Sequence, residues 1–198
     1  MAKTVDFYFT PVSPWTYLGM PRFRAMTAKH RPVVRYKPVD MGPLFASAGV
    51  KPVKDRAEPL KRNRLNELKR WRAHLGMPLN TEPKHFPTSP LLASKMIIAA
   101  RQAGHDVGAL TEAYLRACWA EERDVGDEAT AIAIANECGL DGRTLRPVAD
   151  SPEVQAEFEV NTKEALGRFV WGSPTYYVDG ELFFGQDRLE FVERKLAG

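Results

Sequence analysis

The chain has 198 residues, enough to bury one core and to form one domain, or one domain with an insertion. Its 44% hydrophobic and 27% charged residues are typical of a soluble protein, and no apolar run approaches the roughly 18 residues of a membrane span. A formal net charge of +3 does not by itself indicate a nucleic-acid partner. The N-terminal segment enters a strand at once, so we expect no signal peptide and a cytoplasmic location.

The first predicted elements are a β-rich strand over residues 4–9 and a helix that begins at Pro14. Ser13 precedes this helix at the N-cap position, where serine is favoured. Pro14 suits the first helical position because its missing N–H would have no intrahelical partner there. On this stretch alone, Ser13 is predicted to cap the helix and needs no chemical role.

The middle of the chain is predicted to be helical. A second strand over residues 32–39 would lie parallel to the first, but no strand pattern follows between residues 43 and 168. A basic helix ends at Gly76 and is followed by a polar, Pro-rich loop over residues 79–90 that can lie over a cleft. Further helices are predicted from Ser89 or Ser94 and over about residues 108–122, 127–138 and 152–168, with Asp127 and Ser151 as helix starts.

The C-terminal segment predicts a hairpin followed by a helix. Asp179-Gly180 lies between two apolar runs, which is a strong hairpin signal. Pro174 stands at the head of the first run, where a missing N–H is tolerated. The two ends of the chain therefore form β-α-β and β-β-α units, the order of the thioredoxin fold. We expect an α/β domain from residues 1–42 and 169–198, with an all-helical domain of residues 43–168 inserted.

The basic residues, the cysteines and the histidines do not by themselves indicate a functional site. Residues 51–74 are strongly basic, but most of these charges are expected on a solvated helix face, and no nucleic-acid motif accompanies them. Cys118 and Cys138 form no C-x-x-C pair and are expected to be reduced thiols in helices. The four histidines are scattered, and no metal-ligand spacing occurs, so no metal site is predicted.

Several short motifs occur in order along nearly the whole chain. They are Asp6–Phe9, Ser13–Gly19, Pro59–Lys61, Leu68–Trp71, Phe86-Pro87, Gly172–Thr175 and Phe184–Arg188. As a set, they resemble the 2-hydroxychromene-2-carboxylate isomerases and the related kappa-class glutathione transferases, within the wider DsbA-like group. The resemblance implies a thioredoxin fold, glutathione as the cofactor and a homodimer.

The resemblance also assigns roles to site residues. Ser13 stands where thioredoxin-type enzymes place a reactive cysteine, and a hydroxyl cannot exchange disulfides. We therefore expect the sulfur to come from glutathione, with Ser13 stabilising its thiolate by a hydrogen bond at the helix N-terminus. Ser173 would bind the tripeptide through its backbone, beside a cis Pro174. The remaining contacts implied for glutathione are Lys61, Gln186 and Asp187, although Asp187 can equally be an ordinary helix N-cap.

The substrate implied by the family is an aromatic ring with a pyruvate-like side chain, from naphthalene-type catabolism. Glutathione thiolate would add to this substrate and leave again, so turnover would consume no glutathione. Such a carboxylate needs an apolar slot and a cation, and the candidates are Trp15, Trp71, Phe86 and either Lys61 or Arg64. The chain departs from its relatives at Val50 and Ser89, where they often have asparagine, which affects substrate identity most.

Other functions are compatible with the same residues. A kappa-like transferase or peroxidase would keep the thiolate site but consume glutathione. A non-catalytic thioredoxin-like module would not bind glutathione at all. Ser13 and Thr16 argue against a DsbA-type oxidoreductase, and the lack of a nearby base argues against a serine hydrolase.

Overall fold

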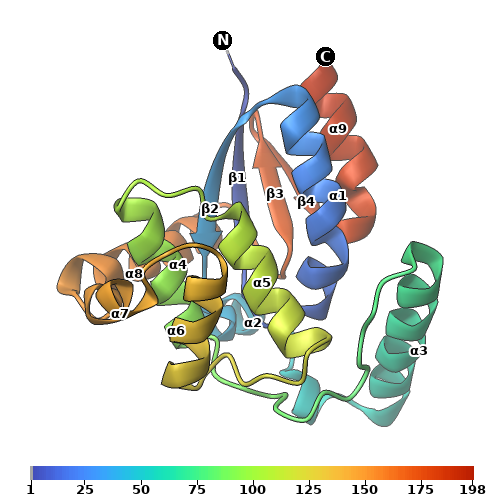
Figure 1. The fold of residues 1–198 in the computed structure, drawn as a ribbon. Coiled ribbons are helices and arrows are strands. Elements are labelled where there is room, and N and C mark those ends of the chain that lie inside the picture. Colours follow the sequence, from blue (N-terminus) through green and yellow to red (C-terminus); the bar gives the residue numbers. More distant parts are fainter. Residues whose placement is uncertain (1) are drawn as a thin grey trace.

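The computed structural model describes residues 2–198, and its centre is a four-stranded mixed sheet (Figure 1). The strands follow the order β2-β1-β3-β4. Strand β1 pairs in parallel with β2 and antiparallel with β3, and β3 pairs antiparallel with β4. The strands are β1 (Thr4–Phe9), β2 (Val33–Pro38), β3 (Thr175–Val178) and β4 (Glu181–Phe184).

The connections between these strands confirm the predicted thioredoxin-like order. Helix α1 (Pro14–His30) joins β1 to β2 as a parallel crossover. The hairpin between β3 and β4 turns at Asp179 and Gly180, whose φ angles are 47° and 84°. Both angles are positive, as a tight hairpin turn of this kind requires. The chain closes with the short 3₁₀ helix η2 (Gln186–Arg188) and helix α9 (Leu189–Ala197).

The two faces of β1 have different surroundings. Phe7 and Phe9 point into the main apolar core, where Phe7 stacks on Tyr176 with ring centroids 5.3 Å apart. Asp6 and Tyr8 point to the opposite face, as the two-residue period of a strand requires. The sheet is therefore covered on both faces, which explains why its central strand is buried almost throughout.

The second face carries a polar cluster that joins α8 (Pro152–Gly167) to the sheet. The Tyr8 hydroxyl donates to a carboxylate oxygen of Glu164 at 2.8 Å, and Arg168 donates to Asp6 at 2.6 Å. Lys37 completes the cluster by donating to Glu164. These contacts link positions 127 to 162 residues apart in the chain, so they form only when the whole fold is in place.

The inserted segment is helical within the described residues, as predicted. Its elements are α2 (Met41–Ser47), η1 (Val53–Asp55), α3 (Glu58–Leu75), α4 (Leu91–Gln102), α5 (Gly108–Trp119), α6 (Glu128–Glu137), α7 (Gly142–Ala149) and α8. Asp127 and Ser151 cap α6 and α8 as expected. Helix α4 follows Pro90, so it begins between the two predicted serines.

Helices α2 and α7 were not predicted. Each is short and contains glycine and proline, which have the lowest helix propensities. Both begin at an aspartate cap, Asp40 and Asp141, whose side chains accept hydrogen bonds from first-turn amides. A local cap and packing against neighbouring helices therefore outweigh weak propensity in these two segments.

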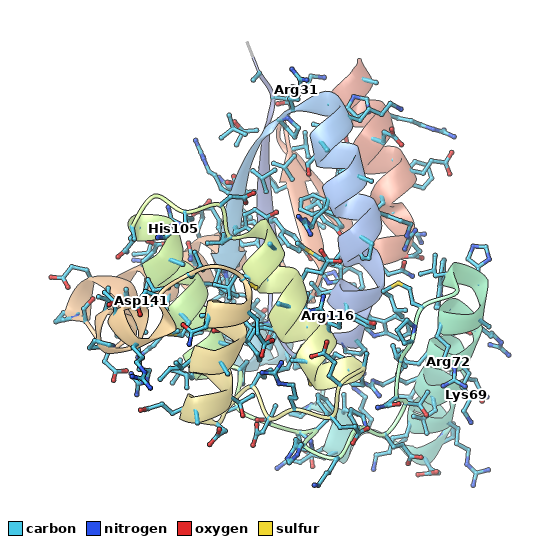
Figure 2. The ribbon with its side chains drawn as sticks, viewed as in Figure 1. Arg31, Lys69, Arg72, His105, Arg116 and Asp141 are labelled. Carbon is cyan, nitrogen blue, oxygen red and sulfur yellow. The ribbon has the colours of Figure 1, made fainter. Side chains whose placement is uncertain are left out.

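Helix α3 ends at Gly76 as predicted, and it lies beside α1 at one side of the fold (Figure 1). Arg72 donates to the backbone oxygen of Leu79 at 2.9 Å and so ties α3 to the loop that follows it, whereas Lys69 is exposed (Figure 2). This loop contains a cis bond between Phe86 and Pro87, which was not predicted.

The division into a thioredoxin-like domain and a helical domain stays a prediction. Helix α2 begins at Met41 and α8 ends at Gly167, close to the expected boundaries after residues 42 and 168. One apolar core nevertheless runs through both parts, since it includes Phe7 of the sheet and Trp119 of α5. This shared core gives the elements around α1 fixed positions relative to one another.

Candidate functional site

The N-terminus of α1 is the centre of the candidate site. Ser13 caps the helix, and its hydroxyl oxygen accepts from the Thr16 amide at 3.2 Å. The same hydroxyl donates to the backbone oxygen of Ser173 at 3.1 Å. The Trp15 amide has no hydrogen-bond partner within residues 2–198. A hydroxyl, a free amide and the positive end of a long helix thus meet at one point, an arrangement that favours an anion.

The loop before β3 packs directly against this helix end. The Ser173–Pro174 bond is cis, which confirms the predicted isomer. The Ser173 hydroxyl accepts from the Thr10 amide at 3.0 Å and lies 2.8 Å from the Thr16 hydroxyl. Ser13 and Ser173 are both more than nine-tenths buried, so these polar groups depend on one another for hydrogen bonds.

Two adjoining cavities open beside this point. The smaller has a volume of about 260 Å³ and the larger about 850 Å³. They share four lining residues, Trp15, Glu67, Ser173 and Phe184, so they lie next to each other, and we call the two together the cleft. Ser13 lines the larger cavity close to this shared boundary. The cleft therefore offers room for two ligands that meet near the N-terminus of α1.

The smaller cavity is lined by Gln186 and Asp187 of η2. Gln186 is buried and accepts a hydrogen bond from Arg22 of α1. Gly19 allows α1 to approach closely here, because a Cβ atom at this position would lie 2.8 Å from Cβ of Gln186. Asp187 lies inside the 3₁₀ helix, and α9 begins after Arg188, so the N-cap interpretation of Asp187 was wrong.

The larger cavity combines aromatic walls with partly buried cationic groups. Arg64 of α3 extends over the rings of Phe86 and Trp119, 5.7 Å from each ring centroid. Burial, together with the neighbouring charge of Arg56, lowers the pKa of Arg64 to about 10. The cavity therefore holds a guanidinium group in a poorly solvated, apolar setting.

The structure brings most of the predicted site residues together. Ser13, Trp15, Arg64, Phe86 and Ser173 line the larger cavity. Trp15, Trp71, Ser173, Gln186 and Asp187 line the smaller one.

Lys61 and Pro174 line neither of these two cavities. Among the positions that depart from the relatives, Val50 lines the larger cavity. The Ser89 hydroxyl instead accepts from the Leu91 amide at 3.4 Å, just before α4.

Several lining residues were not predicted. Arg56, Glu67, Trp171 and Phe184 are the most prominent of them. Arg56 and Glu67 belong to a basic run in which no single side chain carries a distinguishing signal. Trp171 and Phe184 flank the predicted hairpin, and their ring centroids lie 3.9 Å apart at the cavity wall. Their separation of 13 positions gave no local sign of this contact.

Neither cysteine lines these cavities. Cys118 is buried in α5, where burial raises its pKa to about 12. Cys138 lies at the end of α6, and burial raises its pKa too. Across residues 2–198, no group of three or more His, Cys, Asp and Glu side chains could hold a metal ion. No helix of the same residues is long and apolar enough to cross a membrane.

Known proteins resemble this chain over nearly its whole length. A protein from Sphingobium xenophagum named 2-hydroxychromene-2-carboxylate isomerase is 31% identical over 99% of each chain. A Caenorhabditis elegans protein named glutathione S-transferase kappa 2 is 25% identical over 98% of this chain and 92% of its own. A solved 2-hydroxychromene-2-carboxylate isomerase has a TM-score of 0.80 and 25% identity, with 98% of this chain and 94% of that chain covered.

The resemblance drawn from the motifs is confirmed by relatives of both names. The family model of the DSBA-like thioredoxin domain matches residues 4–197, which include both the sheet and the inserted helices. The chain belongs to the DSBA-like thioredoxin family.

Proposed function

We propose that the protein is a glutathione-dependent isomerase, of the type that acts on 2-hydroxychromene-2-carboxylate in naphthalene-type aromatic catabolism. One observation carries the proposal most directly. Ser13, the free Trp15 amide and the positive end of α1 meet at a two-part cleft that neither Cys118 nor Cys138 lines. Such a site suits an anion, and we infer that this anion is a sulfur supplied by a bound ligand.

Ser13 is the residue that we assign to catalysis. Bound glutathione would supply a thiolate that adds to a conjugated carbon of the substrate and later leaves. A free thiol has a pKa of roughly 8.5, so the protein must favour the anion at neutral pH. The Ser13 hydroxyl can turn its proton from the Ser173 carbonyl oxygen toward the sulfur, and the Trp15 amide can donate to the same atom. Each donor would lower the pKa of the thiol.

The smaller cavity suits the peptide portion of glutathione. Ser173 can pair with the tripeptide through its backbone, as an added strand. Asp187 lines this cavity and can bind the ammonium group, and Gln186 can hydrogen-bond the adjacent carboxylate. Lys61 remains our candidate for the other carboxylate of glutathione.

The larger cavity suits an aromatic carboxylate. Trp15 and Phe86 line it as apolar walls, and Arg64 supplies a poorly solvated cation. Trp71 lies in the smaller cavity instead, so we now assign it to the glutathione side of the cleft. A homodimer and a cytoplasmic location remain proposals that rest on the family resemblance.

A kappa-like transferase or peroxidase is the second candidate. The full-length similarity to a relative named glutathione S-transferase kappa 2 favours it. Both candidates use the same thiolate site, and they differ in whether glutathione is consumed. The third candidate, a non-catalytic module, predicts that glutathione does not bind.

Two measurements test the proposal. Titration of the protein with glutathione in a calorimeter should give heat of binding. The ultraviolet absorbance of the thiolate should appear at pH values below the pKa of the free glutathione thiol. Incubation with 2-hydroxychromene-2-carboxylate should then convert the substrate while the free-thiol concentration stays constant. Loss of free thiol would favour the transferase, and absence of binding at millimolar glutathione would favour the module.

A further inference from the structure

Two arginine side chains line the larger cavity from different segments. Arg64 comes from the second turn of α3, and Arg56 comes from the segment between η1 and α3. Neither forms an ion pair with a carboxylate of residues 2–198. Two guanidinium groups near one another in a partly buried cavity repel each other, so their arrangement needs a counterion to be favourable.

Arg64 is the more isolated of the two. Its guanidinium lies 5.7 Å from the ring centroids of both Phe86 and Trp119, and no hydrogen bond joins it to the described part of the chain. Cation–π contact offsets only part of the solvation that the group has lost. Its five N–H donors are therefore available to a ligand in the cavity.

A hydrogen bond to the backbone holds the Arg56 side chain, but no carboxylate of residues 2–198 pairs with its charge. Its Nε donates to the backbone oxygen of Lys51 at 2.8 Å, and its guanidinium carbon lies 5.7 Å from the ring centroid of Phe45. This hydrogen bond orients the group and leaves the terminal nitrogen atoms for a second contact. Phe45 and Lys51 line the same cavity, so the Arg56 side chain is fixed at its edge.

The acidic residues of the cavity have other partners. Asp40 caps α2 by accepting from the Gly42 amide at 2.8 Å. Glu67 accepts a hydrogen bond from Arg70 on the exposed side of α3. Neither carboxylate forms an ion pair with Arg56 or Arg64 among residues 2–198, so the guanidinium groups keep donors for an added anion.

We propose that Arg56 and Arg64 together bind the carboxylate end of the substrate, with the carboxylate at Arg64 and the oxygen on the adjacent carbon at Arg56. That oxygen is a hydroxyl in the ring-closed chromene and an oxo group once the ring has opened. A guanidinium group binds a carboxylate through two parallel hydrogen bonds, and a second guanidinium can donate a hydrogen bond to the neighbouring oxygen. The aromatic ring of the substrate then lies against the apolar walls. This inference rests on the proposed function, because it names the substrate group that the same cleft recognises.

Binding of substrate-like probes tests the proposal without turnover. Phenylpyruvate carries both groups, 3-phenylpropionate carries only the carboxylate, and 4-phenyl-2-butanone carries only a ketone. Calorimetric titration of the wild-type protein should rank them in that order, with phenylpyruvate at least about tenfold tighter than the neutral ketone. Equal affinity for all three probes would overturn the proposal.

Variants separate the two arginines. Arg64→Met should weaken both acids at least about tenfold and leave the ketone unchanged, whereas Arg64→Lys should recover part of the affinity. Arg56→Gln should weaken phenylpyruvate more than 3-phenylpropionate. Arg62→Gln is the matched control, because Arg62 is exposed on the same helix and pairs with Glu58. Wild-type affinity for phenylpyruvate in both Arg64 variants would contradict the assignment.

Glutathione titration of the same variants keeps this inference distinct from the proposed function. If wild-type protein ranks the probes as expected but does not bind glutathione, the arginine site stands and the glutathione-dependent isomerase fails. If glutathione binds equally well to the wild type and Arg64→Met while neither discriminates between acids and ketone, the isomerase stands and the arginine site fails.

Discussion

The Ser13 hydroxyl donates its proton to the backbone carbonyl oxygen of Ser173, 160 positions away in the chain, at 3.1 Å. The hydroxyl is therefore already engaged in joining α1 to the loop before β3. Any role in stabilising a thiolate requires the proton to turn away from that oxygen. The exchange costs little, because one neutral hydrogen bond is replaced by a stronger charge-assisted one.

Replacing Ser13 with alanine should impair activity far more than stability. Loss of the cap should lower the free energy of unfolding by about 1 kcal/mol, and loss of one anion-stabilising donor should lower kcat about 10²- to 10³-fold. The pKa of bound glutathione, followed by thiolate absorbance, should rise at the same time. Denaturant unfolding and steady-state kinetics measure the two effects separately.

Ser151 provides a matched control for this variant. It also caps a helix, is also followed by proline, and accepts from the Val154 amide at 3.3 Å. Ser151→Ala should therefore cost similar stability and leave activity unchanged. Equal loss of activity in both variants would mean that Ser13 acts only as a cap.

Asp187→Asn should weaken glutathione binding by about tenfold, because the variant keeps the shape of the side chain and removes its charge. The rate at saturating glutathione should stay near that of the wild type, since Asp187 lines the smaller cavity while Ser13 lines the larger one. Calorimetric titration measures the affinity for glutathione, and steady-state kinetics measure its KM and the rate at saturation. Asp179→Asn in the hairpin is the control, because Asn tolerates the positive φ there. A kcat effect in Asp187→Asn without a change in glutathione affinity would refute the assignment.

Gly172→Ala should distort the cleft wall. A Cβ atom at this position would clash with an edge carbon of the Phe184 ring, so the ring must move. Overpacking of this kind costs about 1–3 kcal/mol of stability. Adding Phe184→Leu should recover part of the loss by relieving the clash. Gly167→Ala is the control, because a Cβ there meets no atom within 4 Å, and it should be neutral or stabilising in denaturant unfolding.

Acid should destabilise the protein partly through Glu164. Burial raises the pKa of this carboxyl, but hydrogen bonds from Lys37 and Tyr8, with the charges of Lys37 and Arg168, outweigh burial and leave the pKa below its ordinary value. The stabilisation from Glu164 is therefore complete above the unfolded pKa of roughly 4.3 and is lost as pH falls through the folded pKa.

Glu164→Gln should lower the free energy of unfolding at pH 7 by about 1–2 kcal/mol and make stability less dependent on pH below 5. Thermal or denaturant unfolding across pH 3–7 measures both effects. Glu159→Gln, an exposed change one turn earlier in α8, should leave the pH dependence unchanged. An unaltered acid slope in Glu164→Gln would contradict the proposed role of the cluster.

Much of the fold could be predicted because its signals are local. The Ser13 cap, the Asp179-Gly180 turn and the end of α3 at Gly76 depend on backbone angles and hydrogen bonds within a few residues. Helices α2 and α7 were missed because their helix propensity is weak, so that an aspartate cap and packing against neighbouring helices decide whether they form.

The sequence by itself determined the cap at the start of α1, because a serine followed by proline after a strand predicts a capped helix with a hydroxyl at its N-terminus. Only the tertiary structure decided which side chains share the cleft with that hydroxyl. Arg56, Trp171 and Phe184 reach it from segments far apart in the chain. Their meeting depends on how the sheet and α3 pack together, and no pattern within any one of those segments encodes that contact.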